Sequence, residues 1–479
     1  MLIRKKRIFA VLVCAILLTY YLTFAILDGP VICADSPSYI GCFLSREPFY
    51  CAFLAIFRVV FGETIYLNVV VIVQSLFMGL CTFSLVNYIR REFALGILGT
   101  CPVTAVCLGV SLVCKLFTAH KANYCNLIMT EGICVSLVLI FFRLIIDFII
   151  NERYLRLIWA SLVAAVAITT RKQMYFILMV MLIAVIFVAL RHLIGNKMPA
   201  NNKDTRKFWK PVIYLVLCIV FIFAFNKGFE AVYSRVVYGE STKHFNDNRF
   251  FTTVAFYVAE REDGELIEDP EIRELFYTIY DECDAEGSMM HSASGNIVDV
   301  LNHYGDHYDM IQIDHMWPEI EAYAEEKVSG GSLAADSIDI AREEITDAVS
   351  STIFRELLPK IWPKMLLVFG RSFYHRMVNT VGRATTTWMY AYAVILFAVY
   401  IFMLIYLGIK RRSRKTVIFA SFVLLSATLN IALVSVVIFC QVRYVIYNMP
   451  LMYIALFLMA REIFGGAQFE RKKLNAYSQ

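Results

Sequence analysis

Side chains that can carry out acid–base and anion-binding chemistry lie close together in the stretch DGPVICADSPSYIGCFLSREPFY, which runs from Asp28 to Tyr50. Asp35 and Tyr39 form the pattern D-S-x-x-Y, and Arg46 opens the pattern R-x-P-x-Y that ends at Tyr50. A carboxylate can accept a proton from an attacking hydroxyl group, and a guanidinium can hold two oxygens of a phosphate. These residues are therefore candidates for acid–base chemistry and for binding an anion.

Two further charged groups stand beside apolar runs. Glu131 lies in the triplet Thr130-Glu131-Gly132 before one run, and Arg171 and Lys172 lie in a short turn between two others. An acid at the end of a membrane helix is costly unless it faces water or a partner, although it can also complement the positive end of the helix dipole. The two cations indicate an anionic partner, either a lipid phosphate or Glu131, or else they anchor the turn in the headgroup layer.

Basic and aromatic residues mark the last third of the chain. Arg443 and Tyr444 stand at the head of the last apolar run, and Arg371, His375 and Arg376 gather before an earlier one. Both groups are suited to bind lipid phosphates, and the alternative for each is an ordinary anchor at the membrane interface.

Membrane helices must position all these residues. Hydrophobic residues make up 59% of the chain, its mean hydropathy is +0.62, and several apolar runs exceed about 18 residues, which excludes a soluble enzyme. The runs predict an all-α polytopic membrane protein with about ten transmembrane helices. The stretch Phe49–Phe61 is apolar but too short to cross the bilayer, so it is predicted to be an interfacial helix in the first outer loop.

An uneven charge distribution orients these helices. From Gly228 to Ser350 there are 28 Asp and Glu against 7 Lys and Arg, whereas short links such as Lys410–Lys415 (KRRSRK) are basic. Basic residues in short loops remain in the cytoplasm, while long loops are translocated largely regardless of charge. Both termini are therefore predicted to be cytoplasmic, with the candidate residues and the acidic region on the outer side.

Three parts are expected along the chain. Residues 1–227 form an N-terminal membrane module of seven spans, and its first outer loop, residues 28–64, carries the chemistry. Residues 228–384 form an acidic, mainly helical extracytoplasmic domain. Residues 385–479 form a C-terminal membrane module of three spans and a cytoplasmic tail.

Within the acidic region, amphipathic patterns predict helices at Pro270–Glu282 and Ser337–Leu358. The run HYGDHYDMIQIDHMW, from His303 to Trp317, contains metal-binding residue types. Its spacing fits no recognised set of ligands, so it is predicted to be solvated polar surface.

Thirteen cysteines do not indicate a disulfide framework, because most lie in apolar runs where a thiol behaves as a small hydrophobic group. Cys33 and Cys42, in the first loop, could pair if that loop faces an oxidising compartment.

The motifs and their order resemble those of the GT-C superfamily of membrane glycosyltransferases, such as the protein mannosyltransferases and aminoarabinose transferases. D-S-x-x-Y with R-x-P-x-Y resembles the first outer loop of these enzymes, T-E-G precedes the fourth span, and R-Y with Pro450 precedes or opens the last. The resemblance covers the first six spans and the last one, and it does not extend to residues 226–382. Several GT-C branches have an acid adjacent to the first-loop Asp, whereas Ser36 follows Asp35 here.

The resemblance implies transfer of a sugar from a polyprenyl-phosphate-linked donor to a glycan, lipid or protein acceptor. The reaction would occur on the outer face of a bacterial-type cytoplasmic membrane and contribute to cell-envelope glycans. Asp35 would be the catalytic base. The donor phosphate and lipid would contact Arg443, Tyr444, Arg171 and Lys172, and substrate-binding or supporting roles would fall to Tyr39, Arg46, Tyr50, Glu131, Arg371, His375 and Arg376.

No cofactor is required by these patterns. If a divalent cation such as Mg²⁺ or Mn²⁺ binds, Asp35 and Glu131 are its expected ligands. Membrane lipids are expected partners and nucleic acid is not. Two other classes of function stay open: a lipid-linked saccharide flippase or transporter, which would need polar residues within the spans and internal repeats, and a non-enzymatic membrane protein that binds or assembles others.

Overall fold

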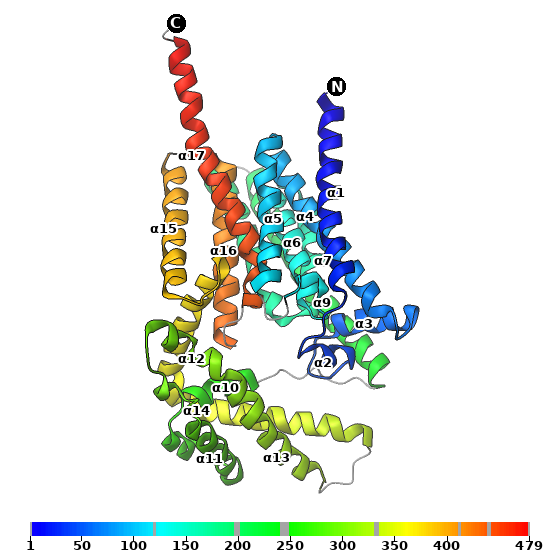
Figure 1. Ribbon diagram of the computed structural model, residues 1–479, viewed down its shortest axis with the longest axis vertical. Coiled ribbons are helices and arrows are strands. Elements are labelled where there is room, and N and C mark those ends of the chain that lie inside the picture. The colour runs from blue at the N-terminus through cyan, green and yellow to red at the C-terminus, as the bar shows by residue number, and fades with distance from the viewer. Residues whose placement is uncertain are drawn as a thin grey trace. The chain divides into compact units, whose positions relative to one another are not determined.

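The computed structural model of the chain describes residues 2–117, 121–195, 202–239, 249–329, 335–410, 413–437 and 442–477. These residues are almost entirely helical, and the only strand-like pairing among them is a single bridge between Val31 and Leu127 (Figure 1). The chain divides into two compact units. Unit 1 comprises Met1–Ser241, Ile395–Asn430 and Ile446–Gln479, and unit 2 comprises Thr242–Val394 and Ile431–Val445.

Seven helical stretches in the described part of the chain are long and apolar enough to cross a membrane: Arg7–Asp28, Tyr66–Glu92, Glu131–Asn151, Lys172–Leu193, Phe208–Val237, Thr387–Ile409 and Arg414–Val436. By length and composition, these helices identify an all-α multi-pass membrane protein. About ten spans were expected. Two of the expected spans correspond to the shorter apolar helices Ile97–Val113 and Tyr154–Thr170, and the expected last span is not among the seven.

The long helices of unit 1 are α1 (Leu2–Asp28), α4 (Tyr66–Glu92), α5 (Ile97–Phe117), α6 (Glu131–Asn151), α7 (Tyr154–Thr170), α8 (Tyr175–Gly195), α9 (Asn202–Val237), most of α15 (Thr387–Ile409) and α16 (Arg414–Val437), and α17 (Met449–Tyr477). Helix α6 is central, because it packs against α4, α7 and α8 and 83% of its most apolar stretch is buried. Most of its residues are apolar and buried, with Glu131, Arg143 and Asp147 as the charged exceptions, as expected for a helix enclosed by others.

The ends of unit 1 differ in what they carry. The N-terminal end of α1 and the C-terminal end of α17 lie at the same end of this unit, and the short helices α2 (Ser36–Ile40) and α3 (Pro48–Phe61) lie at the opposite end (Figure 1). Helix α3 begins with Pro48, whose missing N–H is unneeded in a first turn, and stops at Gly62, whose φ of 74° suits glycine. It exposes Ile56, Val59 and Val60, an apolar face of the kind expected of an interfacial helix.

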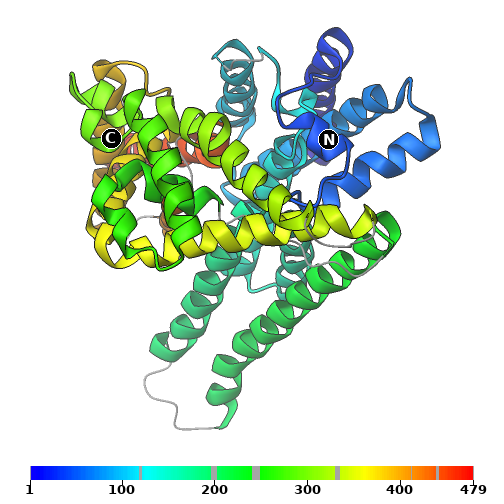
Figure 2. The same cartoon turned by 90° about the horizontal axis from the view of Figure 1, so that it is seen from below.

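Unit 2 contains α10 (Arg249–Val258), α11 (Pro270–Ala285), α12 (Ile297–Asp309), α13 (Trp317–Ser329) and α14 (Ala335–Val381). Helices α10 and α13 pack along α14 (Figure 2). The sequence predicted that α14 would end at Leu358, before Pro359 and Pro363, but the helix continues through both prolines. Its core residues explain the continuation, since the apolar stripe keeps its helical spacing past the prolines: Val349, Ile353, Leu357, Ile361 and Val368.

The histidine-rich segment of unit 2 is helical, and it is not wholly the solvated polar surface that was expected, because Tyr304, Tyr308, Ile311 and Met316 are buried in the hydrophobic core. His315 lies in a π-helical turn (Met310–Met316), with its Nδ1 3.1 Å from Glu282 Oε2 and its Nε2 3.0 Å from Glu286 Oε2. Burial alone would lower the pKa of His315, but these two carboxylates raise it above its ordinary value. The histidine is therefore held by two acids of α11.

Candidate functional site

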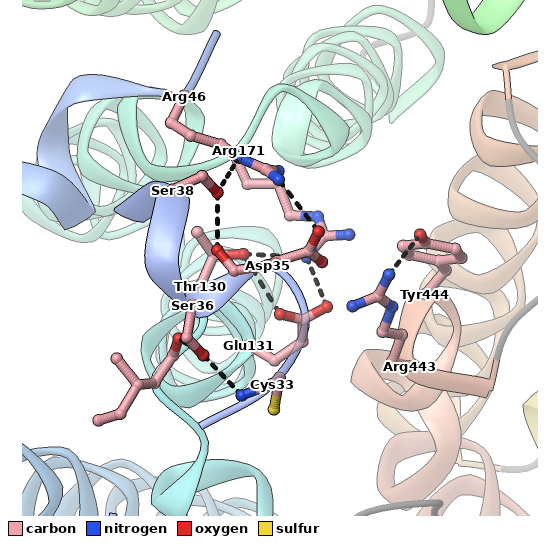
Figure 3. A network of polar contacts seen from close by, with 11 residues as sticks. Cys33, Asp35, Ser36, Ser38, Arg46, Thr130, Glu131, Arg171, Arg443 and Tyr444 are labelled. Carbon is pink, nitrogen blue, oxygen red and sulfur yellow. Dashed lines mark hydrogen bonds and ion pairs between the residues drawn. The ribbon is translucent and has the colours of Figure 1, made fainter. Parts of the chain in front are cut away.

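The loop that follows α1 is fastened to the segment that leads into α6. The Val31 N–H donates to the Asn126 carbonyl oxygen at 2.9 Å, and the Ile128 N–H donates to the Val31 carbonyl at 3.0 Å. Asn126 Nδ2 donates to the Gly29 carbonyl at 2.9 Å, and Ser36 Oγ donates to the Ile128 carbonyl at 2.9 Å. These bonds bring two segments nearly a hundred residues apart into one polar cluster (Figure 3).

Asp35 is fixed in this cluster and remains accessible. Its Oδ1 accepts a hydrogen bond from Arg46 Nη2 at 3.0 Å, and its side chain is 31% exposed. Arg46 Nε also donates to Ser38 Oγ at 2.7 Å, and Ser38 Oγ donates to the Asp35 carbonyl at 2.7 Å (Figure 3). Asp35 occupies the N-cap position of α2, yet its side chain does not cap that helix. Helix capping therefore does not account for this carboxylate.

Aromatic rings hold Arg46 in place. The guanidinium carbon of Arg46 lies 4.8 Å from the centre of the Tyr39 ring, which meets the Tyr50 ring edge-on at 5.4 Å. Burial raises the pKa of Tyr39, so its hydroxyl stays neutral. Burial also acts to lower the pKa of Arg46, but the neighbouring Tyr39 and Asp35 raise it overall, so the guanidinium stays charged.

Glu131 and Arg171 form a buried ion pair. Arg171 Nη1 donates to Glu131 Oε1 at 2.6 Å and to Thr130 Oγ1 at 2.9 Å (Figure 3). The Glu131 side chain has no exposed surface, and that of Arg171 is 16% exposed. The sequence left the partner of Arg171 open between a lipid phosphate and Glu131, and the structure shows the pairing with Glu131. Glu131 also lies in the first turn of α6, where a negative charge complements the helix dipole.

Gln74 on α4, which the sequence analysis did not single out, joins α3 to the segment that leads into α6. Its Oε1 accepts a hydrogen bond from the Tyr50 hydroxyl at 3.0 Å, and its Nε2 donates to the Cys125 carbonyl at 2.9 Å. A β-carbon at Gly132 would lie 2.7 Å from Gln74 Nε2, so only glycine fits there in the T-E-G triplet. A polar residue inside an apolar run was the available signal for Gln74.

The turn that carries Arg171 and Lys172 makes two further contacts. The backbone N–H of Lys172 donates to Glu47 Oε1 at 3.3 Å, which ties the turn to the first loop. Gln173 Nε2 donates to Asn430 Oδ1 at 2.8 Å, which ties it to α16. Sequence reasoning missed Glu47, Gln173 and Asn430, because single polar residues at helix ends have many explanations.

The remaining candidate residues belong to unit 2. Arg443 Nη2 donates to the Tyr444 hydroxyl at 3.1 Å, and the Arg443 guanidinium carbon lies 5.0 Å from the centre of the same ring. On α14, Arg376 is fully buried and His375 nearly so, which places both away from the exposed basic rim that was expected. Arg371 lies near Tyr257. Burial raises the pKa of Tyr257 to about 12, and the charge of Arg371 acts in the opposite direction.

Burial and the adjacent Arg376 lower the pKa of His375 to about 4. The imidazole is therefore neutral at pH 7, and its Nδ1 lies 2.9 Å from the Tyr390 hydroxyl, which can donate to it. A neutral, hydrogen-bonded histidine indicates a structural role within unit 2.

A divalent cation at Asp35 and Glu131 does not fit the geometry. Each carboxylate already pairs with a guanidinium, and those two positive charges would oppose a bound cation. In the part of the chain that the structure describes, no group of three or more His, Cys, Asp or Glu residues is placed to hold a metal ion. Asp35 and Glu131 therefore act in this cluster as partners of Arg46 and Arg171.

The fold and the cluster define the chain as a multi-pass all-α membrane protein with an accessible carboxylate on a loop fastened to its helix bundle. No protein-family model matches the sequence, and a comparison with curated proteins finds no match. A function must therefore be inferred from the residues themselves.

Proposed function

We propose that the chain is an integral membrane glycosyltransferase of the GT-C type. It would move a sugar from a polyprenyl-phosphate-linked donor to an acceptor on the outer face of a bacterial-type cytoplasmic membrane. Asp35 acts as the general base that takes a proton from the acceptor hydroxyl as the phosphate of the donor leaves. The prenyl tail of such a donor lies in the bilayer, which accounts for a reactive loop built on membrane helices.

The difference in exposure between the two carboxylates is the observation that carries this proposal. Asp35 is 31% exposed and held by Arg46, so an acceptor hydroxyl can reach it in a fixed position. Glu131 has no exposed surface and is neutralised by Arg171, so it cannot meet a substrate without breaking a buried ion pair. Asp35 is therefore the base, and Glu131 supports the loop.

Positive charge is needed for the phosphate that leaves. Arg443 is suited to this role because a guanidinium stays charged and can bind two phosphate oxygens at once, with Tyr444 holding it from one side. Arg171 and Lys172 add positive charge, although Arg171 serves Glu131 first. Preorganised charges of this kind stabilise the transition state of the transfer.

Ten membrane crossings, with α5, α7 and α17 added to the seven helical stretches that are long and apolar enough to span a membrane, complete the proposal. An odd number of crossings would leave the two termini on opposite sides of the membrane. The first helix begins and the last helix ends at the same end of unit 1 (Figure 1), which supports an even number. The basic link Lys410–Lys415 supports a cytoplasmic location for that end and an outer location for the loop with Asp35.

The proposal is tested by incubating the purified protein with a panel of radiolabelled polyprenyl-phosphate sugars and an extract of cell-envelope glycans. We expect transfer of label to a product, or slow release of free sugar, that requires the protein. Glu265→Gln, which removes an exposed acid of unit 2, should behave like the wild type. Absence of both transfer and release with every donor, by protein that retains its helical circular dichroism, would reject this function.

A further inference from the structure

Two cysteines of the first outer region lie against each other. Cys42 follows α2 and is 9% exposed, and Cys51 lies on α3 and has no exposed surface. Cys42 Sγ lies 4.0 Å from the Cys51 carbonyl oxygen, and the two thiol groups are within hydrogen-bonding reach of each other. The sequence allowed Cys42 to pair with Cys33 in an oxidising compartment, and in the structure Cys33, Cys42 and Cys51 are all free thiols. Cys33 Sγ lies 3.9 Å from the Val31 carbonyl oxygen.

The backbone holds the Cys42 side chain in this position. Its φ of 55° lies in the left-handed region, where a residue with a β-carbon is disfavoured and glycine would be expected. The Cys42 N–H donates to the Tyr39 carbonyl at 3.3 Å, and the Tyr238 hydroxyl donates to the Cys42 carbonyl at 2.6 Å. A cysteine kept in an unfavourable conformation by contacts on both sides indicates that its thiol has a use.

The two thiols differ in acidity. Hydrogen bonding from the Cys51 side chain lowers the pKa of Cys42 to about 6, in spite of burial. The same hydrogen bond and burial raise the pKa of Cys51. Such a pair has one thiol ready to attack a disulfide and a second positioned to resolve the product.

We propose that Cys42 and Cys51 form a disulfide bond that closes a ten-residue ring, residues 42–51, in the first outer region. The inference rests on the proposed outer, oxidising location of this loop, but not on any transfer activity. The ring contains Arg46, the partner of Asp35, and ends on α3, so it would fix the loop covalently to the helix beside it.

The reaction is a thiol–disulfide exchange with a disulfide-bonded oxidant. The Cys42 thiolate attacks one sulfur of that oxidant, a mixed disulfide forms, and the first oxidant thiolate leaves. Cys51 then loses its proton and attacks the Cys42 sulfur, and the second oxidant thiolate leaves. Two S–H bonds are broken and one S–S bond is formed, and the oxidant takes up the two electrons and two protons.

Peptide mapping of the wild-type protein tests the proposal. Membranes are denatured in N-ethylmaleimide, reduced, and then treated with isotopically heavy N-ethylmaleimide before mass spectrometry. We expect Cys42 and Cys51 to carry the heavy reagent, and an unreduced sample to contain one cross-linked peptide that joins them. Cys33 should carry the light reagent. In Cys33→Ser the cross-link should remain unchanged.

Light reagent on both Cys42 and Cys51 would overturn the proposal, as would a cross-link from Cys42 to Cys33. This readout is independent of the function proposed above. A cross-linked protein that transfers no sugar would reject the proposed glycosyltransferase function and support the disulfide. An active protein in which both thiols carry the light reagent would support the function and reject the disulfide.

Discussion

The buried pair of Glu131 and Arg171 allows a quantitative test of how the loop is supported. In Arg171→Met the carboxylate of Glu131, which has no exposed surface, would lose its ion-pair partner at 2.6 Å, while the Thr130 hydroxyl would still donate to its Oε2 at 3.3 Å. Removing one partner of a buried ion pair typically costs about 3–5 kcal/mol. We expect Arg171→Met to lose about 3 kcal/mol, because Glu131 can take up a proton when its partner is absent.

The double variant Glu131→Gln with Arg171→Met measures the interaction between the two side chains apart from the other effects of each substitution. It leaves no buried charge, so it should lose only about 1–2 kcal/mol, which is less than the loss from Arg171→Met alone, and the double-mutant cycle should therefore be non-additive. Equilibrium unfolding in mixed detergent micelles, followed by circular dichroism, supplies the free energies. The control is Arg58→Met, which removes a 3.7 Å contact with Glu63, a side chain that is 77% exposed, and it should cost under about 1 kcal/mol.

Two results would refute this reasoning. Unfolding of Arg171→Met at the wild-type free energy would mean that the carboxylate is not held by this guanidinium. Additive effects in the cycle would mean that Glu131 and Arg171 act separately.

Three further predictions concern topology, the leaving phosphate and pH. In a background without reactive cysteines, an impermeant thiol reagent added to intact cells should label Glu265→Cys but not Arg414→Cys, and the reverse pattern would overturn the proposed orientation. Arg443→Ala should abolish transfer. Arg443→Lys should reduce transfer about tenfold or more, because Lys keeps the charge but cannot bind two phosphate oxygens in the planar geometry of a guanidinium. Wild-type turnover of purified Arg443→Ala would show that Arg443 does not have this role. His375, with its pKa near 4 because of burial and Arg376, should stabilise the fold above pH 6.5, and this contribution of about 2–3 kcal/mol should be lost as the pH falls towards 4. His375→Gln should flatten that part of the unfolding profile, and an unchanged slope would contradict the assignment.

The helices could largely be predicted from the sequence, because apolar runs such as the one that becomes α6 dictate a buried helix in a membrane protein. The end of α14 could not, since Pro359 and Pro363 indicate a break and only the core spacing of Ile361 and Val368 shows that the helix continues. Local signals fixed the type of each element better than its length.

The candidate loop was found from residue types, but its contacts were not. Asp35 and Arg46 were both singled out, and the structure adds that they pair with each other. Two of the bonds that fasten the loop, from Val31 to Asn126 and from Ile128 to Val31, join backbone atoms and leave no pattern in the sequence. The sequence suggested Cys33 beside Cys42, whereas the structure brings Cys42 against Cys51, because spacing along a chain does not reveal which side chains a turn brings together.

Replacement of Asp35 by Asn tests the central proposal most directly. The change keeps the size of the side chain and removes its ability to accept a proton, so transfer from a labelled polyprenyl-phosphate sugar should fall about a hundredfold or more while the protein still inserts and folds. Asp28→Asn is the matched control, since Asp28 pairs with Lys115 at 2.5 Å and has no part in the proposed reaction. The account predicts an inactive Asp35→Asn beside an active Asp28→Asn. An active Asp35→Asn would contradict the account. If Asp28→Asn were then inactive, Asp28 and not Asp35 would be the base. If both variants were active, the chain would have a binding role and not a catalytic one.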